Sequence, residues 1–280
     1  MKIINSKTIE NAVEELCIKA NCFLPDDVKS AISDAFNSET NQTAKDILKD
    51  LVKNYEIAEN ENIPVCQDTG MAVFFVEIGQ NVVIEGESIE RAINNGVKKG
   101  YENGYLRKSV VSDPLFRTNT NDNTPAVIHY DIVEGENLKI TFMPKGFGSE
   151  NMSALKMLKP SDGVEGIKNF VIDTVKNAGS NPCPPIVLGI GIGGTMEKAA
   201  VLSKKALTRD VFSCNENEFY SKLEQELKEA INNLGIGVSG LGGNTTVLGV
   251  NIETYPTHIA GLPVAVNVSC HVTRHTSITL

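Results

Sequence analysis

Three of the six cysteines stand in segments that could hold a metal centre. Cys66, Cys183 and Cys270 each lie beside turn-forming residues next to an apolar run, in PVCQDTG, NPCPPIVLG and VSCHVTRH. Three thiolates without a fourth suit a [4Fe–4S] cluster with one open iron, because clusters that carry electrons are normally held by four cysteines. An iron without a protein ligand is a Lewis acid that can polarise a hydroxyl or a carboxylate.

The cysteine spacing alone is also compatible with unrelated thiols or with zinc, because the three residues are much farther apart than in a C-x-x-C motif. A tetrahedral zinc site would need a histidine or a fourth cysteine, and His271 stands next to Cys270. Cys17 and Cys22 belong to an amphipathic helical segment and suit core packing. Cys214 lies in SCNENE, a predicted surface loop without a partner motif.

A glycine-rich stretch points to a different chemistry. Gly189, Gly191 and Gly194 in LGIGIGGT satisfy G-x-G-x-x-G between an apolar run and a helical pattern, as in dinucleotide-binding proteins. Asp210 has the spacing of a ribose-binding acid, but it does not end an apolar strand. Tight turns with close backbone approach, or an anion site at a helix start, would give the same pattern. An NAD-dependent dehydrogenase therefore remains an alternative.

Other classes of protein use the same residues differently. An electron-transfer protein would need four protein ligands for its cluster. A scaffold subunit would use neither the cysteines nor the glycines. Iron and sulfide analysis separates these two classes from a cluster enzyme, and a thermal shift with NAD tests the dehydrogenase.

Composition excludes some partners. The formal net charge of −9 repels phosphate backbones, so we expect no nucleic-acid partner. No apolar run approaches the roughly 20 residues needed to span a bilayer, and the first residues lack the apolar core of a signal peptide. We therefore expect a cytoplasmic protein with no membrane partner, in which scattered cysteines are thiols or metal ligands.

The elements that must position these residues are mixed. Residues 1–60 carry three helical stripes. Buried strands are predicted at 71–78, 186–190, 246–250 and 264–268, and two paired strands at 126–133 and 138–143. Helical patterns cover 86–100, 149–158, 164–178, 195–207 and 216–234. The prediction is a mixed α/β fold: a helical N-terminal portion, 1–60, followed by a mixed α/β core that binds the cluster, within one domain, 1–280.

Longer motifs carry a resemblance to a known family. The chain is similar, in order and over nearly its whole length, to the α region of class I fumarate hydratases and to their relatives, the L-tartrate dehydratase α subunits. The segments that carry this resemblance are CQDTG at 66–70, LRKSVVSDPL at 106–115, NTNDNTPAVIH at 119–129, PKGFGSEN at 144–151, NPCPPIVLGIGIGGT at 181–195 and the final CHVTRHTSITL.

The resemblance implies a [4Fe–4S] cluster held by Cys66, Cys183 and Cys270, with the fourth iron left for substrate. It implies an oxygen-sensitive hydro-lyase that converts fumarate to L-malate in the tricarboxylic acid cycle, or L(+)-tartrate to oxaloacetate. It also implies a separate fumarase-type β subunit that completes the site, an assembly of two αβ pairs, and no activity for this chain alone.

The resemblance assigns roles to further residues. Asp68 and His258 match catalytic residues, and Asp68 could exchange a proton with the substrate hydroxyl. From its neighbours alone, Asp68 would be an Asx-turn residue. The matching substrate-binding residues are Gln67, Arg107, Lys145 and Gly146, and a guanidinium such as that of Arg107 pairs bidentately with a carboxylate. Weaker candidates are Arg117, His129 and His271.

Overall fold

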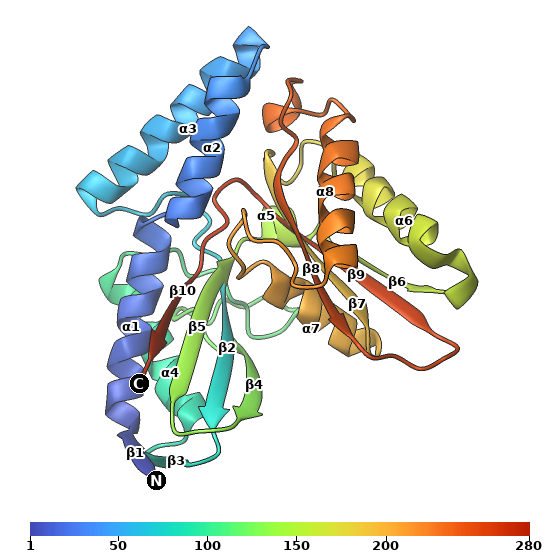
Figure 1. Cartoon of the computed structure of the whole chain (residues 1–280). Coiled ribbons are helices and arrows are strands. Elements are labelled where there is room, and N and C mark those ends of the chain that lie inside the picture. Colours follow the sequence, from blue (N-terminus) through green and yellow to red (C-terminus); the bar gives the residue numbers. More distant parts are fainter. The chain divides into compact units, whose positions relative to one another are not determined.

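The computed structural model describes residues 1–280 and divides the chain into two compact units. Unit 1 comprises Met1–Pro25, Tyr55–Phe147 and Arg274–Leu280, and unit 2 comprises Asp26–Asn54 and Gly148–Thr273. Helices and strands are interspersed along the chain, which confirms the predicted mixed α/β class (Figure 1). None of the helices is both long enough and apolar enough to cross a membrane.

Unit 1 contains a four-stranded sheet in the order β10-β5-β2-β4, visible in Figure 1, and a two-stranded sheet of β1 and β3. β2 pairs in parallel with β4 and antiparallel with β5, and β5 pairs antiparallel with β10. Its elements are β1 (Lys2–Asn5), α1 (Ser6–Cys22), β2 (Met71–Gly79), β3 (Val82–Glu85), α4 (Ile89–Asn103), β4 (Val127–Val133), β5 (Leu138–Lys145) and β10 (Thr276–Thr279).

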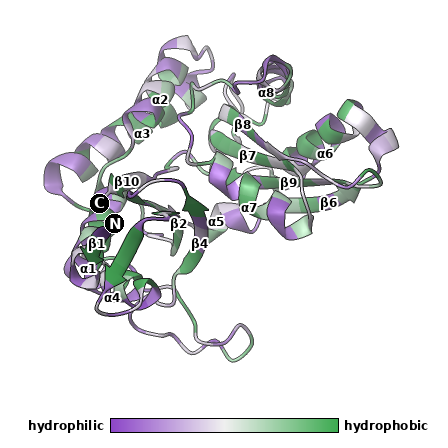
Figure 2. Cartoon of the chain, turned by 60° about the horizontal axis from the view of Figure 1, so that its bottom comes forward, coloured by the Kyte–Doolittle hydropathy of each residue, from purple (hydrophilic) through white to green (hydrophobic).

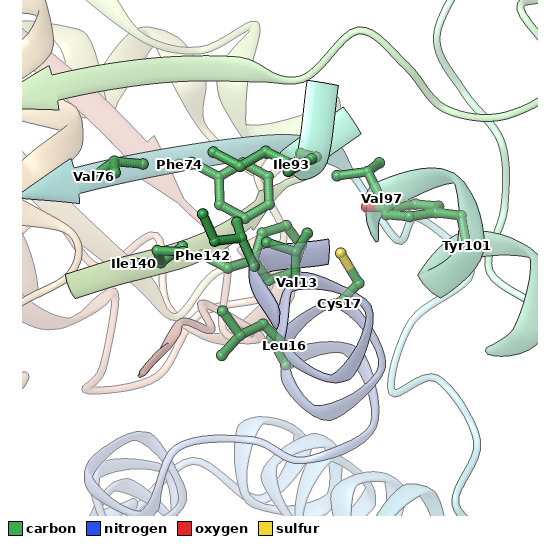
Figure 3. Packing of buried hydrophobic residues seen from close by; sticks show 14 of the residues in the cluster. Val13, Leu16, Cys17, Phe74, Val76, Ile93, Val97, Tyr101, Ile140 and Phe142 are labelled. Carbon is green, nitrogen blue, oxygen red and sulfur yellow. The ribbon is translucent and has the colours of Figure 1, made fainter. Parts of the chain in front are cut away.

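The core of unit 1 lies between its sheet and the helices α1 and α4 (Figure 3). The rings of Phe74 on β2 and Phe142 on β5 are fully buried, with centroids 5.0 Å apart. Val13, Leu16 and Cys17 on α1 complete this apolar cluster. Burying one such large side chain contributes about 1.5–3 kcal/mol, so this cluster holds α1 and α4 against the sheet.

The predicted pairing of residues 126–133 with 138–143 is wrong, although both strands exist. β2 lies between them, because β4 and β5 each pair with β2 and not with each other. The burial pattern accounts for this order. Five consecutive residues of β2 are buried, whereas the second half of β4 is exposed. A strand buried on both faces belongs in the middle of a sheet, and a half-exposed strand belongs at its edge.

Unit 2 contains a second four-stranded sheet, in the order β6-β9-β7-β8. β7 pairs in parallel with β8 and antiparallel with β9. Its strands and long helices are α2 (Asp26–Ser38), β6 (Ala154–Leu158), α6 (Gly163–Ala178), β7 (Ile186–Gly193), α7 (Met196–Ala206), α8 (Glu218–Asn232), β8 (Val247–Tyr255) and β9 (Leu262–Ser269). Short 3-10 turns occupy Pro160–Asp162 and Val238–Gly240. In Figure 2 the strands of both units are largely green, while α3 (Gln42–Glu61) alternates between purple and green.

One predicted helix, 149–158, is wrong. Only the short α5 (Phe147–Glu150) is helical, and Ala154–Leu158 forms the strand β6. β6 pairs with β9 at the sheet edge, and three of its five side chains are exposed. The pairing with β9 is a long-range interaction that overrides the local helical pattern.

The two sheets share one connection pattern. In each, a central strand leads through helical segments to a parallel neighbour, and the chain then returns as an antiparallel strand on the other side of the central strand. This describes β2, β4 and β5 in unit 1 and β7, β8 and β9 in unit 2. The residues before β2 and after β5 therefore lie together at one end of the strands of the first sheet. The residues before β7 and after β9 lie at the equivalent end of the second sheet.

The glycines of LGIGIGGT are packing residues. Gly189 and Gly191 lie inside β7, beneath α7, and not in a turn after the strand. A Cβ atom at Gly189 would lie 2.0 Å from the backbone oxygen of Ser203, and one at Gly191 would lie 2.1 Å from that of Ala199. Close backbone approach at these glycines is confirmed, and the context expected of a dinucleotide-binding turn is missing.

Gly191→Ala is expected to destabilise the chain strongly, because a methyl group there would push α7 off β7. Overpacking typically costs about 1–3 kcal/mol, and a clash with backbone gives little room to relax. Thermal unfolding of Gly191→Ala beside Gly261→Ala measures the effect of the clash. A Cβ atom at Gly261 would lie no closer than 3.8 Å to a neighbouring atom and its backbone is outside the left-handed region, so a similar loss there would refute the packing role of Gly191.

Candidate active site

In unit 1, the loop Cys66–Gly70 runs into the start of β2. Cys66 is half-buried, and its Sγ lies 3.6 Å from Oε1 of the exposed Gln67. At the end of the loop, Gly70 has a φ of +76°, and a Cβ there would lie 2.7 Å from the Lys145 nitrogen. The loop therefore packs directly against the C-terminal end of β5, which ends at Lys145 and is followed by Gly146.

The Asp68 carboxylate is held by two backbone N–H groups. Oδ1 accepts a hydrogen bond from the Gly70 nitrogen and Oδ2 accepts one from the Phe147 nitrogen, each at 3.0 Å. Gly146 passes close by, since a Cβ there would lie 3.1 Å from Asp68 Oδ2. The predicted Asx turn is present, and the second bond fixes the carboxylate against the Gly146–Phe147 segment as well.

Two buried side chains anchor the rest of this loop. The Tyr101 hydroxyl donates to the carbonyl oxygens of Thr69 at 2.7 Å and Gly70 at 3.0 Å. Burial raises the pKa of Tyr101 well above its usual range, so its hydroxyl stays protonated and able to donate. Asn123 Nδ2 also donates to the Gly70 oxygen, at 3.2 Å, and its Oδ1 accepts from the Ser109 nitrogen at 2.7 Å.

The two predicted substrate-binding cations differ in exposure. Arg107 is exposed, and its backbone oxygen accepts a hydrogen bond from Thr69 Oγ1 at 3.1 Å, which ties it to the Cys66 loop. Lys145 is only 2% exposed, with its Nζ 3.5 Å from the Gly146 oxygen. Arg107 can thus meet a carboxylate from outside, whereas the Lys145 side chain is enclosed.

In unit 2, Cys183 and Cys270 lie at the same end of two neighbouring strands of the sheet. Cys183 stands three residues before β7 and Cys270 directly follows β9, whose Ser269 pairs with Val187. The Cys183 carbonyl accepts a hydrogen bond from His271 Nδ1 at 2.9 Å, which places the ring proton on Nδ1. The structure therefore brings two of the three candidate ligands to the same edge, and His271 acts as a link between their segments.

The backbone around Cys183 is unusual. Cys183 has a φ of +54°, a conformation that L-residues other than Asn rarely adopt and that recurs at functional sites. A second glycine-rich stretch, GIGVSGLGG at 235–243, supports it, since the Ser239 nitrogen donates to the Pro184 oxygen at 2.7 Å. The Cys183 thiol itself is exposed.

His258 lies at the other end of the same sheet. It belongs to the exposed connection between β8 and β9, and its Nδ1 accepts from the Ala260 nitrogen at 3.2 Å. The eight residues of β9 separate this connection from Cys270, a length of about 26 Å at the usual strand rise. Unit 2 thus does not bring His258 to the two cysteines.

Two weaker candidates make local contacts. The His129 ring stacks on Phe75 with centroids 5.2 Å apart. Arg117 is exposed, and its Nη1 donates to the Pro114 oxygen at 3.4 Å within the same turn. These contacts account for both residues as parts of the fold of unit 1.

The thiols fit the chemistry of a cluster. Neither unit by itself gathers three His, Cys, Asp or Glu side chains closely enough for a metal ion. Cys66, Cys183 and Cys270 nevertheless all lie in loops and are partly or fully exposed, whereas Cys17 and Cys22 are buried in α1. Burial raises the pKa of both helix thiols, which disfavours the thiolate needed for ligation.

Thiol labelling is expected to separate these groups. In the chain without cluster, iodoacetamide at neutral pH should modify Cys66, Cys183, Cys214 and Cys270 much faster than Cys17 and Cys22, because only an accessible thiolate reacts. Mass spectrometry of timed samples gives each rate. Rapid labelling of Cys17 in folded protein would contradict this assignment of buried and available thiols.

Sequence reasoning missed Arg274 and Asn21. Arg274 is buried and donates from Nη2 to the Asp68 backbone oxygen at 2.9 Å. Asn21 is also buried and accepts from the same Nη2 at 3.0 Å. Two features of the sequence could have indicated them: Asn21 is a polar residue on the apolar face of an amphipathic helix, and Arg274 lies within the final motif, CHVTRHTSITL.

The fold and these loops define the class: a mixed α/β protein that carries accessible thiols able to ligate a metal centre. The carboxylate of Asp68 is held in place two residues after the thiol of Cys66. The family model described as Fumarate hydratase (Fumerase) matches residues 10–279. The chain therefore belongs to the fumarate hydratase (Fumerase) family, a family of hydro-lyases, which confirms the resemblance in its motifs.

Individual relatives carry a more specific name. A protein of Methanocaldococcus jannaschii, provisionally named L(+)-tartrate dehydratase subunit alpha, is 47% identical over 272 residues, which cover 95% of each chain. The L(+)-tartrate dehydratase subunit alpha of Escherichia coli (strain UTI89 / UPEC) is 35% identical over 251 residues, covering 88% of this chain and 82% of the relative.

Proposed function

We propose that this chain is the α subunit of a [4Fe–4S]-dependent hydro-lyase that hydrates fumarate to L-malate and catalyses the reverse reaction. The observation that carries the proposal is the placement of Cys66, Cys183 and Cys270 in accessible loops at equivalent edges of two sheets with the same connections. Family membership supports the reaction class.

Cys66, Cys183 and Cys270 are the proposed cluster ligands. A cluster held by three thiolates keeps one iron without a protein ligand and, when bound, supplies Lewis acidity toward the substrate. Such an iron is easily oxidised and lost, so the proposal includes inactivation by air.

The chain's own residues have distinct proposed tasks. Asp68 takes up or returns the proton of the hydroxyl, with its carboxylate aimed by the N–H groups of Gly70 and Phe147. Arg107 pairs with a substrate carboxylate, and Gln67 and Gly146 line the same loop region. The buried charge of Lys145 favours a bound dianion. The proton added at carbon comes from a group on the β subunit.

Tartrate is the second candidate substrate. The relatives from Methanocaldococcus jannaschii and Escherichia coli are both named as tartrate dehydratase subunits. Dehydration of L(+)-tartrate gives oxaloacetate and one water, and it calls for the same removal of a hydroxyl next to a carboxylate. The additional hydroxyl of tartrate needs a hydrogen-bonding partner, which the β subunit or Gln67 would provide.

The partner proposal follows from the names of these relatives, which describe an α subunit. We propose that a fumarase-type β subunit completes the site, that two αβ pairs assemble, and that the α chain alone is inactive. Mass measurement of the purified complex tests the assembly.

The test is anaerobic co-production of the chain with the β subunit from its own genome, followed by iron and sulfide analysis. Fumarate loss is followed by ultraviolet absorbance, and oxaloacetate formation from L(+)-tartrate is measured in parallel. Faster turnover of fumarate supports the proposal, and faster turnover of tartrate moves the assignment to the second candidate. A complex without iron and sulfide would refute it.

His258→Asn tests the other predicted catalytic residue. Because unit 2 holds His258 about 26 Å from Cys270 along β9, it cannot reach a group held at Cys270 of the same unit and can act only on a substrate presented from elsewhere in the assembly. If it acts there, kcat is expected to fall by about a hundredfold or more at unchanged iron content. Wild-type kcat in His258→Asn would remove this residue from the mechanism.

A further inference from the structure

Arg274 is a buried arginine that binds the loop carrying Cys66 and Asp68. It is 4% exposed and lies in unit 1. Its Nη2 donates to the Asp68 backbone oxygen at 2.9 Å and to Asn21 Oδ1 at 3.0 Å, and its Nε lies 3.3 Å from the same Oδ1. The guanidinium thus joins the end of α1 to the middle of the loop.

Asn21 is itself fixed on its other side. It is fully buried, and its Nδ2 donates to the Cys17 oxygen at 2.9 Å, which directs Oδ1 toward Arg274. The Asn21 backbone oxygen accepts from the Val65 nitrogen at 2.9 Å, next to Cys66 in the chain. The loop is therefore attached to α1 at two points, directly through Val65 and through Arg274.

A buried guanidinium has a high desolvation cost, which an apolar side chain filling the same space would avoid. Its hydrogen bonds to Asn21 and Asp68 go to neutral amide oxygens of unit 1. The N–H groups of the planar guanidinium point in fixed directions, so Nη2 and Nε hold the two oxygens in a fixed relative position, whereas the donors of a lysine ammonium rotate. This geometry favours a role in positioning the loop.

We propose that Arg274 is the positioning residue for the Cys66–Asp68 loop, an inference that rests on the proposed function. Holding the Asp68 carbonyl fixes the ψ angle of Asp68 and hence the direction of its carboxylate relative to the following N–H of Gly70. The same bond limits rotation of the peptide segment that begins at Cys66. Arg274 does not touch substrate; it acts through Asp68 and Cys66.

The first test is kinetic, in the anaerobic αβ holoenzyme. Arg274→Gln is expected to lower kcat about 30-fold to 100-fold with less than about a threefold change in KM, since a misplacement near 1 Å costs about that much. Arg274→Lys keeps the charge but replaces the rigid planar donors by rotatable ones on a different stem, so it should remain near the Gln variant. Full rescue by Lys would overturn positioning in favour of a charge effect.

The second test needs no cluster. In the full chain without iron, iodoacetamide labelling of Cys66 is expected to be about fivefold to tenfold faster in Arg274→Gln, because the loop opens more often. Cys214, an exposed thiol in unit 2, is the internal reference. Arg209→Gln is the matched control: Arg209 bonds Glu224 Oε1 and the Ile252 oxygen at 3.0 Å in unit 2, and its loss should leave Cys66 labelling and kcat unchanged.

If Arg274→Gln does not fold, Asn21→Ser weakens the same anchor and should shift both readouts in the same direction by less. Wild-type Cys66 labelling and wild-type kcat in a folded variant would overturn the inference. A wild-type complex without cluster refutes the proposed function instead, while the labelling comparison still decides the positioning role.

Discussion

Cys183→Ser is expected to remove the cluster and the turnover of the αβ enzyme while leaving the chain folded. A serine hydroxyl is not deprotonated at neutral pH and is a poor ligand for iron, whereas a thiolate is a good one. The fold loses little, because two hydrogen bonds that hold residue 183 are made by its backbone: its nitrogen donates to the Ser180 oxygen at 3.1 Å and its oxygen accepts from His271. The exposed side chain buries no core surface.

Cys214→Ser is the matched control for this experiment. Cys214 is also exposed and also lies in unit 2, but it belongs to no predicted ligand set. Iron, sulfide, visible absorbance and turnover should match wild type in Cys214→Ser and disappear in Cys183→Ser, with equal melting temperatures for the two cluster-free chains. Full cluster content in Cys183→Ser would show that another residue ligates the iron, and zinc without sulfide would replace the cluster proposal.

Sequence patterns predicted the strands that consist of a continuous run of apolar residues. The continuous apolar runs of β2, β7 and β9 could only be buried strands or buried helices, and their lengths favoured strands. The order of strands was not predictable in this way, since β2 separates β4 from β5 although a short turn joins them. β6 was not predicted as a strand, because its strand character depends on pairing with β9, about a hundred residues later in the chain.

The division of the chain into two units could not be predicted from sequence patterns, because it also depends on long-range contacts. α2 belongs to unit 2, more than a hundred residues before most of that unit. Asp27 Oδ2 accepts from the Val211 nitrogen at 2.8 Å, and Glu39 Oε2 accepts from the Asn244 nitrogen at 2.8 Å. Single hydrogen bonds of this kind leave no periodic pattern in a sequence.

For the candidate site, sequence motifs predicted the residues, and the structure shows the hydrogen bonds that hold them in place. Cys66, Asp68 and Cys183 were visible from turn-forming neighbours and from the resemblance. The hydrogen bond between Arg274 and Asn21 spans a sequence separation of 253 residues and has no local signature. Supports of this kind follow only from the fold, because they join segments that topology brings to one sheet edge.

Asp68→Asn is expected to lower kcat by about a thousandfold at unchanged iron content, within the range for loss of a general acid or base. The amide cannot take up a proton at neutral pH. Its oxygen can still accept from the Gly70 nitrogen, but its NH₂ group would face the Phe147 N–H, so one loop bond is lost as well. Losing that bond costs about 1 kcal/mol of local stability, which is far too little to explain a thousandfold effect.

Asp113→Asn separates the two contributions. Asp113 Oδ1 accepts from the Leu115 and Phe116 nitrogens, both at 2.8 Å, and these bonds hold the pKa of Asp113 below its usual range. It is a backbone-bound aspartate of the same unit without a proposed proton-transfer role, so its amide variant should keep kcat within about twofold of wild type. If Asp68→Asn behaves like Asp113→Asn, Asp68 is an Asx-turn residue and the proton must go elsewhere. If Asp68→Asn loses iron together with turnover, its carboxylate holds the Cys66 loop for ligation, and the proton-transfer role falls.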